Sequence, residues 1–187
     1  LFSLALAGLS IAQALVGVIG VQLITQEFRF TLRPTFSAEP RRQRVMAAKA
    51  ITITVVGLTI GAIAVPTGLL IGGSLLEARD FPFESGGPGF WRATIGAVVI
   101  TAIYGLIGLG LGAVLRSPAA AITLYVVWVM LVEGIVYAVV PKVGQYAPFQ
   151  AGSQLSSIEP IEPGLGALWG GVLFAAFATV VVATGTV

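Results

Sequence analysis

Long apolar stretches dominate the hydrophobic pattern of this chain, and short polar segments separate them. Five of these stretches are long enough to cross a bilayer as helices, which takes about 20 apolar residues. They cover about residues 1–24, 47–75, 93–114, 119–140 and 166–187. Apolar residues lie all around each predicted helix, and the period-two alternation typical of a membrane β-barrel is absent. The pattern predicts an all-α polytopic membrane protein with one transmembrane domain, residues 1–187.

The composition agrees with this interpretation and narrows the possible chemistry. The chain is 57% hydrophobic and 10% charged, whereas soluble domains carry about 25% charged residues. It has no cysteine and no histidine, which excludes disulfides, thiol catalysis, histidine-based acid–base chemistry and most zinc sites. Asp80 is the single aspartate, so no aspartyl pair exists. We therefore expect no enzymatic activity, no cofactor, no metal and no nucleic-acid partner for this chain.

Glycines recur four residues apart within the predicted spans, a spacing that lets two helices approach closely in lipid. The pairs are Gly57/Gly61, Gly68/Gly72, Gly108/Gly112 and Gly166/Gly170. Pro66 lies inside the second span, where we expect a kink.

The basic residues predict which side of the membrane each loop faces. The connections 25–46 and 115–118 share one side, which holds seven basic residues when Lys49 at the start of the next span is included, whereas 76–92 and 141–165 hold three on the other. The first group is Arg29, Arg33, Arg41, Arg42, Arg44, Lys49 and Arg116, and the second is Arg79, Arg92 and Lys142. By the positive-inside rule, the first side is cytoplasmic. A further span before Leu1 would give six spans with both ends in the cytoplasm.

The first cytoplasmic loop, residues 25–46, is divided by two prolines. Pro34 and Pro40 each push the preceding residue out of the helical region and each suit the first turn of a new helix. The loop therefore predicts a short helix over residues 34–39 between two long ones. Because an isolated helix this short is unstable in water, it needs a partner surface. Alternatively, the arginines of this loop bind anionic lipid headgroups.

Several segments of the chain resemble the ABC-2 type transporter permeases, the membrane subunits of bacterial ABC exporters. The first is "ITQEFRFTLRPTFSAEPRRQRVMAAKAI", in residues 24–51, which is similar to the cytoplasmic loop of that family. "LGLGAVLRSPAAAITL" resembles the family's short cytoplasmic turn, and "YAPFQAGSQL" resembles its external segment before the last span. The segments follow one another in the family's order over essentially the whole chain. The family's first span and its basic C-terminal tail have no counterpart here.

The resemblance implies a non-catalytic permease that works with a separate ATPase. The short cytoplasmic helix would be a coupling helix docked on an ABC ATPase subunit, present in two copies, which would bind ATP and Mg²⁺. A second permease copy would complete a homo- or heterodimer in the bacterial inner membrane, exporting a drug, lipid or polymer. The coupling residues would be Glu27, Arg29, Arg33, Thr35, Phe36, Glu39, Arg41 and Arg42, with Arg116 in the second cytoplasmic turn. Alternatively, Phe28, Phe30 and Phe36 anchor the chain at the membrane interface.

The chain has no sequence of its own for binding ATP. The pattern G-x-x-x-x-G-K-[ST] occurs nowhere in it. The Gly-rich segments "GGPGF" (86–90) and "GLGLG" (108–112) lack the lysine that reaches the phosphates. ATP hydrolysis is therefore expected in a partner subunit.

Glu133 is the one ionisable residue deep within a predicted span. A carboxylate at that depth is expected to face the protein interior or an aqueous path. It is either a polar residue of the translocation path or an interhelical clamp that hydrogen-bonds Tyr125, Tyr137 or a partner span. Gln13 and Gln22 are further clamp candidates. Residues 146–158 are predicted to form a short re-entrant or interfacial helical element, with a plain loop as the alternative.

Two other function classes remain open at this stage. A secondary transporter or channel would use Glu133, but such carriers usually place several polar groups at the midplane. A structural or membrane-assembly protein would not need the short docking helix. The permease interpretation accounts for more of the sequence than either alternative.

Overall fold

Helices make up all the regular secondary structure in the part of the chain that the computed structural model describes. This part comprises residues 2–6, 8–30, 42–81, 86–158 and 164–185, with side chains at all of these positions except 3, 4, 27–30 and 42. In chain order the elements are α1 (Phe2–Ala5), α2 (Leu9–Phe30), α4 (Arg42–Glu77), α5 (Phe90–Leu115), α6 (Pro118–Val127), the π-helix η1 (Trp128–Val132), α7 (Glu133–Val139), α8 (Pro141–Gly144), α9 (Pro148–Ser153), the 3₁₀-helix η2 (Gln154–Ser156) and α10 (Ala167–Thr184).

Five helical segments within the described ranges are long and apolar enough to cross a membrane. They are Leu9–Gln26, Gln43–Glu77, Phe90–Leu115, Pro118–Val139 and Ala167–Thr184. The prediction of an all-α polytopic fold is therefore confirmed, and the protein is a multi-pass membrane protein by the length and composition of its helices.

The first span begins later than the sequence predicted. The spanning helix α2 starts at Leu9 rather than at residue 1, and a separate short helix, α1, precedes it. Glycine is a weak helix former, and Gly8 lies in the break. α1 packs against α4 where that helix carries Gly68 and Gly72. Ala5 and Leu6 therefore make a separate contact with α4 before the first span begins.

The second span is a single helix of 36 residues, α4, which begins at Arg42 in the loop predicted to be cytoplasmic. This agrees with a helix that starts after Pro40 and continues into the membrane. The helix runs on through Pro66, and the predicted kink stays a prediction. The predicted short helix over residues 34–39 lies outside the described residues.

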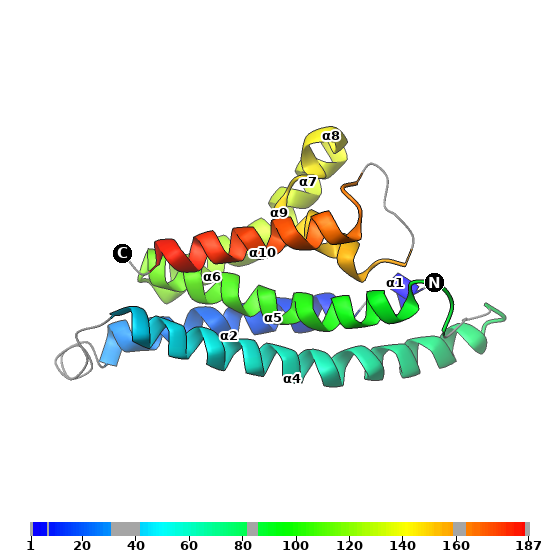
Figure 1. Ribbon diagram of the computed structural model, residues 1–187, viewed down its shortest axis with the longest axis horizontal. Coiled ribbons are helices and arrows are strands. Elements are labelled where there is room, and N and C mark those ends of the chain that lie inside the picture. The colour runs from blue at the N-terminus through cyan, green and yellow to red at the C-terminus, as the bar shows by residue number, and fades with distance from the viewer. Residues whose placement is uncertain (1, 7, 31–41, 82–85, 159–163, 186–187) are drawn as a thin grey trace.

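α5 is the central helix of the bundle and packs against α2, α4, α6 and α10 (Figure 1). Its contact with α2 is close because both helices carry glycine at the crossing. A methyl group at Gly108 would collide with the carbonyl oxygen of Gly17, and one at Gly20 would collide with that of Gly105. Packing of small residues is a main source of helix association in lipid.

The predicted glycine pairs differ in how they are used. Gly57 and Gly61 of α4 face Ala102 and Val98 of α5. In the last predicted pair, Gly170 packs against the carbonyl group of Ala151, but Gly166 has open space around the position of a Cβ atom. The positive φ of Gly166, 78°, places it before the first turn of α10 as its N-cap. Glycine is therefore favoured at position 166 by the backbone conformation there and not by helix packing.

A turn of two residues joins α5 to α6 at the predicted position. Arg116 adopts a left-handed conformation with φ of 53° and closes α5, its N–H donating to the carbonyl oxygen of Gly112. Ser117 is the N-cap of α6, and Pro118 takes the first helical position. This turn, the C-terminal end of α2, the start of α4 and the end of α10 lie at the same end of the bundle (Figure 1).

Candidate functional site

Glu133 follows a local change in helix geometry within the fourth span. Residues Trp128–Val132 form the π-helix η1 between α6 and α7, and the N–H of Glu133 donates to the carbonyl oxygen of Trp128, five residues earlier. In Figure 1, α7 and α8 project away from the bundle beyond this point. π-turns of this kind often occur at functional sites.

The carboxylate of Glu133 accepts three hydrogen bonds. Oε1 accepts from the indole Nε1–H of Trp128 at 2.8 Å, and Oε2 accepts from the backbone N–H groups of Phe149 and Gln150 at 2.9 Å each. The two backbone donors belong to the first turn of α9, where N–H groups have no partner within their own helix. Glu133 therefore acts as an N-cap supplied by another helix, and its charge complements the helix dipole.

Glu133 is 2% exposed, so in this conformation its carboxylate faces protein. The arrangement has a structural role: its hydrogen bonds connect the π-helical part of the fourth span to the short helix α9. A role for Glu133 in a translocation path would require these hydrogen bonds to break and the carboxylate to become exposed.

An aromatic cluster, formed by Tyr104, Phe149 and Phe174, holds α9 against the bundle. The ring centroids of Phe149 lie 5.0 Å from those of Tyr104 on α5 and 5.3 Å from those of Phe174 on α10. Tyr104 and Phe174 lie 5.4 Å apart. Tilted and edge-to-face pairs at these distances add stability beyond their buried area. The three rings contact one another, so the cluster joins α5, α10 and α9.

Gln154 fixes the other end of this element. Its side chain is 3% exposed, and Oε1 accepts from the N–H of Gly166 at 2.9 Å, directly before α10. The predicted helical element over residues 146–158 is thus present as α9 and η2, buried against α5 and α10. Glu133 orients its start, and Gln154 links its end to the last span.

The predicted partners of Glu133 were not the ones that the structure places beside it. Tyr125 donates instead to the backbone carbonyl of Gln13, at 3.4 Å, and Tyr137 packs close to Gly144. Gln13 is half-buried and reaches Tyr125 through its main chain, whereas Gln22 is exposed. Sequence reasoning missed Trp128 and Gln154. Residues five positions apart do not face each other on an α-helix, so the sequence did not indicate that Trp128 contacts Glu133.

Most of the predicted coupling residues lie outside the described part of the chain. This is the case for Arg33, Thr35, Phe36, Glu39 and Arg41. The backbone of Glu27 and Arg29 belongs to the end of α2 and that of Arg42 to the start of α4, and the description does not include these side chains. Their proposed contacts with an ATPase stay predictions.

The helices on either side of that loop are joined directly. Lys49 of α4 donates from Nζ to the carbonyl oxygen of Leu23 in α2. Thr25, one turn from the end of α2, is buried and donates to the carbonyl oxygen of Val21 at 2.8 Å. Arg116 is exposed at the same end of the bundle (Figure 1). The flanks of the loop therefore form one connected unit.

Comparison with known proteins identified no relatives. No protein-family model, no curated protein and no solved structure matches this chain.

Proposed function

We propose that this chain is the permease subunit of an ATP-driven ABC exporter in a bacterial inner membrane. A separate ATPase subunit, present in two copies, would bind ATP and Mg²⁺ and act on residues 31–41 of the chain. A second permease copy would complete the transporter. The cargo would be hydrophobic or amphipathic, such as a drug, a lipid or a polymer.

The observation that carries this proposal is the packing of the two helices that flank residues 31–41. The two flanking helices, α2 and α4, both pack closely on the central helix α5, and Lys49 links them to each other. A displacement applied to the loop would therefore reach three spans together. The order of the segments that resemble the ABC-2 permeases supports the same proposal.

A role as a proton- or ion-driven carrier through Glu133 is less well supported. The carboxylate is buried and already has three donors. A carrier site usually combines several polar groups at a break in the helices. Here the polar contacts of Glu133 are to its own span and to α9.

Co-purification with an ATPase tests the proposal. The full-length protein would be isolated from its native membrane, and accompanying proteins would be identified by mass spectrometry. We expect a subunit with a phosphate-binding G-x-x-x-x-G-K-[ST] sequence. We propose Phe36 as the apolar anchor of the docking surface, so Phe36→Asp, which places a charge there, should remove that subunit.

Phe81→Asp is the matched control, since Phe81 is exposed just beyond the other end of α4. It should retain the ATPase. Isolation of the wild-type protein without an ATPase would contradict the proposal. Equal retention by the Phe36→Asp variant would show that this residue is not the anchor.

A further inference from the structure

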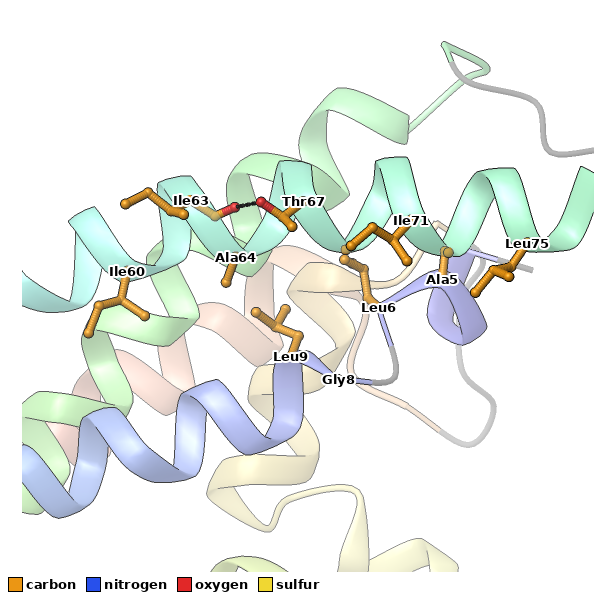
Figure 2. Close-up of a pocket in the computed structure, with 12 residues that line it drawn as sticks. Ala5, Leu6, Gly8, Leu9, Ile60, Ile63, Ala64, Thr67, Ile71 and Leu75 are labelled. Carbon is orange, nitrogen blue, oxygen red and sulfur yellow. Dashed lines mark hydrogen bonds between the residues drawn. The ribbon is translucent and has the colours of Figure 1, made fainter.

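An apolar groove lies between α1, the start of α2 and the C-terminal half of α4 (Figure 2). Its volume is about 570 Å³, within the range of small-molecule sites. Figure 2 shows Ile60 and Ala64 of α4 pointing toward Leu9 at the start of α2. Leu6 and Leu9 are buried and form part of the groove wall. The groove is bounded by α4 on one side and by α1 and the start of α2 on the other.

The lining of the groove favours a hydrocarbon ligand. Thr67 carries the one polar side chain among the described residues that line it, and its hydroxyl donates to the carbonyl oxygen of Ile63 at 2.7 Å (Figure 2). A polar ligand would lose its hydrogen bonds to water without replacing them. An apolar ligand carries no such cost.

The groove is continuous with the surface that faces the membrane. Three residues on its α4 side, Ile63, Ile71 and Leu75, are between 58% and 64% exposed. They belong to a helix that is long and apolar enough to span the bilayer, so lipid hydrocarbon is the medium around them. The acyl chains of neighbouring lipids therefore reach the opening of the groove directly.

The groove is longer than one leaflet of the hydrocarbon core is thick, so an acyl chain from one leaflet fits within its length. Its α4 side runs from Ile60 to Leu75, which is about 22 Å at a rise of 1.5 Å per residue. Half of the hydrocarbon core is about 15 Å thick. Beyond Leu75, the exposed residues Glu77, Arg79 and Asp80 mark the polar end of the helix. Arg79 places a positive charge at the level expected for a phosphate headgroup.

We propose that this groove binds one acyl chain of a phospholipid from the leaflet at the Glu77 end of α4. The chain lies along α4 between Ile60 and Leu75, and its headgroup lies near Arg79. The bound chain fills the space between α4 and the start of α2 and supports their packing. The site requires no ATPase, so the proposal for the groove can be tested independently of the proposed transport function.

Photolabelling of the full chain in nanodiscs tests the site. The nanodiscs would contain phosphatidylethanolamine and phosphatidylglycerol, with a small fraction of phosphatidylglycerol that carries a diazirine on one acyl chain. Peptide mapping should show at least threefold more label on residues 60–75 than on the exposed apolar face of α10, represented by Leu168, Val172 and Val180. Such enrichment distinguishes a bound chain from lipid that merely surrounds the protein.

Filling the groove should remove the enrichment. Ala64→Phe places a ring where Ala64 faces Leu9, and Thr67→Phe adds one at an exposed position of the lining (Figure 2). Ala62→Phe is the matched control, because Ala62 is exposed on α4 and does not line the groove. We expect labelling of residues 60–75 to fall to the level of α10 in both groove variants and to be unchanged in the control.

Three results would overturn the proposal. The first is equal labelling of α4 and α10 in the wild-type protein. The second is undiminished labelling in both groove variants when size-exclusion profiles show that they are folded. The third is cross-linking of residues 60–75 to a protein segment or to a second copy of the chain, which would show that protein covers the groove.

Discussion

Glu133 illustrates at the residue scale how a charged group is accommodated within a span. A carboxylate in an apolar environment is costly unless charge-assisted hydrogen bonds satisfy it. Here the indole of Trp128 and two backbone N–H groups of α9 provide them. The side chain thereby adds polar contacts between the fourth span and α9, which also meet through the rings of Tyr125 and Phe149.

Replacement of Glu133 by alanine should destabilise the fold by about 3 kcal/mol or more. It leaves the Trp128 indole and the N–H groups of Phe149 and Gln150 without an acceptor, and each unsatisfied buried group costs roughly 1–3 kcal/mol. The midpoint of thermal unfolding in detergent should fall markedly. Glu77→Ala, at the exposed end of α4, should leave the midpoint nearly unchanged. Equal effects of the two substitutions would contradict the role of Glu133 as a cap.

A double-mutant cycle isolates the bond between Trp128 and Glu133. Glu133→Gln retains an oxygen that accepts from α9, but it turns an amide donor toward the indole donor. Trp128→Phe should therefore destabilise the wild-type protein by about 1.5–3 kcal/mol through loss of a bond to a charged group. It should cost clearly less in the Glu133→Gln background. The same cost in both backgrounds would mean that the Trp128–Glu133 bond contributes nothing.

The sequence predicted that Glu133 would be buried and hydrogen-bonded, but it could not identify the partners. The depth of a carboxylate within a span follows from residue counting alone. Contact with Trp128 depends on the π-turn, and the sequence of residues 128–132 does not predict this turn. Contact with α9 is a tertiary event between segments that the sequence separates by 16 and 17 residues. These partners therefore had to come from the structure.

At the scale of helices, the crossing of α2 and α5 should be the contact most sensitive to side-chain size. Gly108→Val should destabilise the protein by about 1–3 kcal/mol, because the added methyl groups meet the backbone of Gly17 and cannot be accommodated by a rotamer change. Gly134→Ala is the control, since its position is open. It should be neutral or stabilising by up to about 1 kcal/mol. Thermal unfolding in detergent measures both, and a neutral Gly108→Val would argue against this crossing.

The π-helix η1 makes a second prediction about the fourth span. Five residues of a π-turn occupy the place of four in an α-helix, so deletion of the exposed Met130 should convert η1 into an α-helical turn. Trp128 and Glu133 would then be four positions apart and still on one face. We expect the deletion variant to be expressed and to unfold near the wild-type midpoint.

Deletion of the exposed Val99 in α5 provides the comparison, because α5 has no π-turn to absorb it. Every residue on one side of the deletion would rotate by about 100° around the helix axis. This variant should fail to fold. Failure of both variants, with loss of expression, would show that the five-residue turn itself is required.

The helices were largely predictable, and their ends were less so. Four of the five spans follow directly from apolar runs, since a bilayer demands long hydrophobic helices. The start of the first span was wrong, because residues 2–8 are as apolar as those after them and hydropathy does not indicate where the helix is interrupted. The spacing of Gly166 and Gly170 predicted that both pack against another helix, which is true of Gly170 alone. Spacing alone cannot distinguish a packing glycine from one that begins a helix.

On the scale of the whole molecule, the helix arrangement divides the charged residues between two ends. Arg44, Lys49 and Arg116 lie toward the end where α2 finishes and α4 begins, and Glu77, Arg79 and Asp80 follow the opposite end of α4 (Figure 1). The connectivity therefore agrees with the alternation of loops from which the orientation was predicted. Which end faces the cytoplasm rests on the excess of basic residues alone.

Because the chain contains no cysteine, single cysteines can report this orientation without further engineering. Gln43→Cys and Ala119→Cys place exposed thiols at the basic end, whereas Ala78→Cys and Pro88→Cys place them at the other, between α4 and α5. In intact cells, a membrane-impermeant maleimide should modify positions 78 and 88 and should reach 43 and 119 only after the membrane is opened. The reverse pattern would place residues 31–41 outside the cell, where no cytoplasmic ATPase reaches them. That single result would exclude the proposed coupling to ATP hydrolysis while leaving the helix bundle and the lipid groove intact.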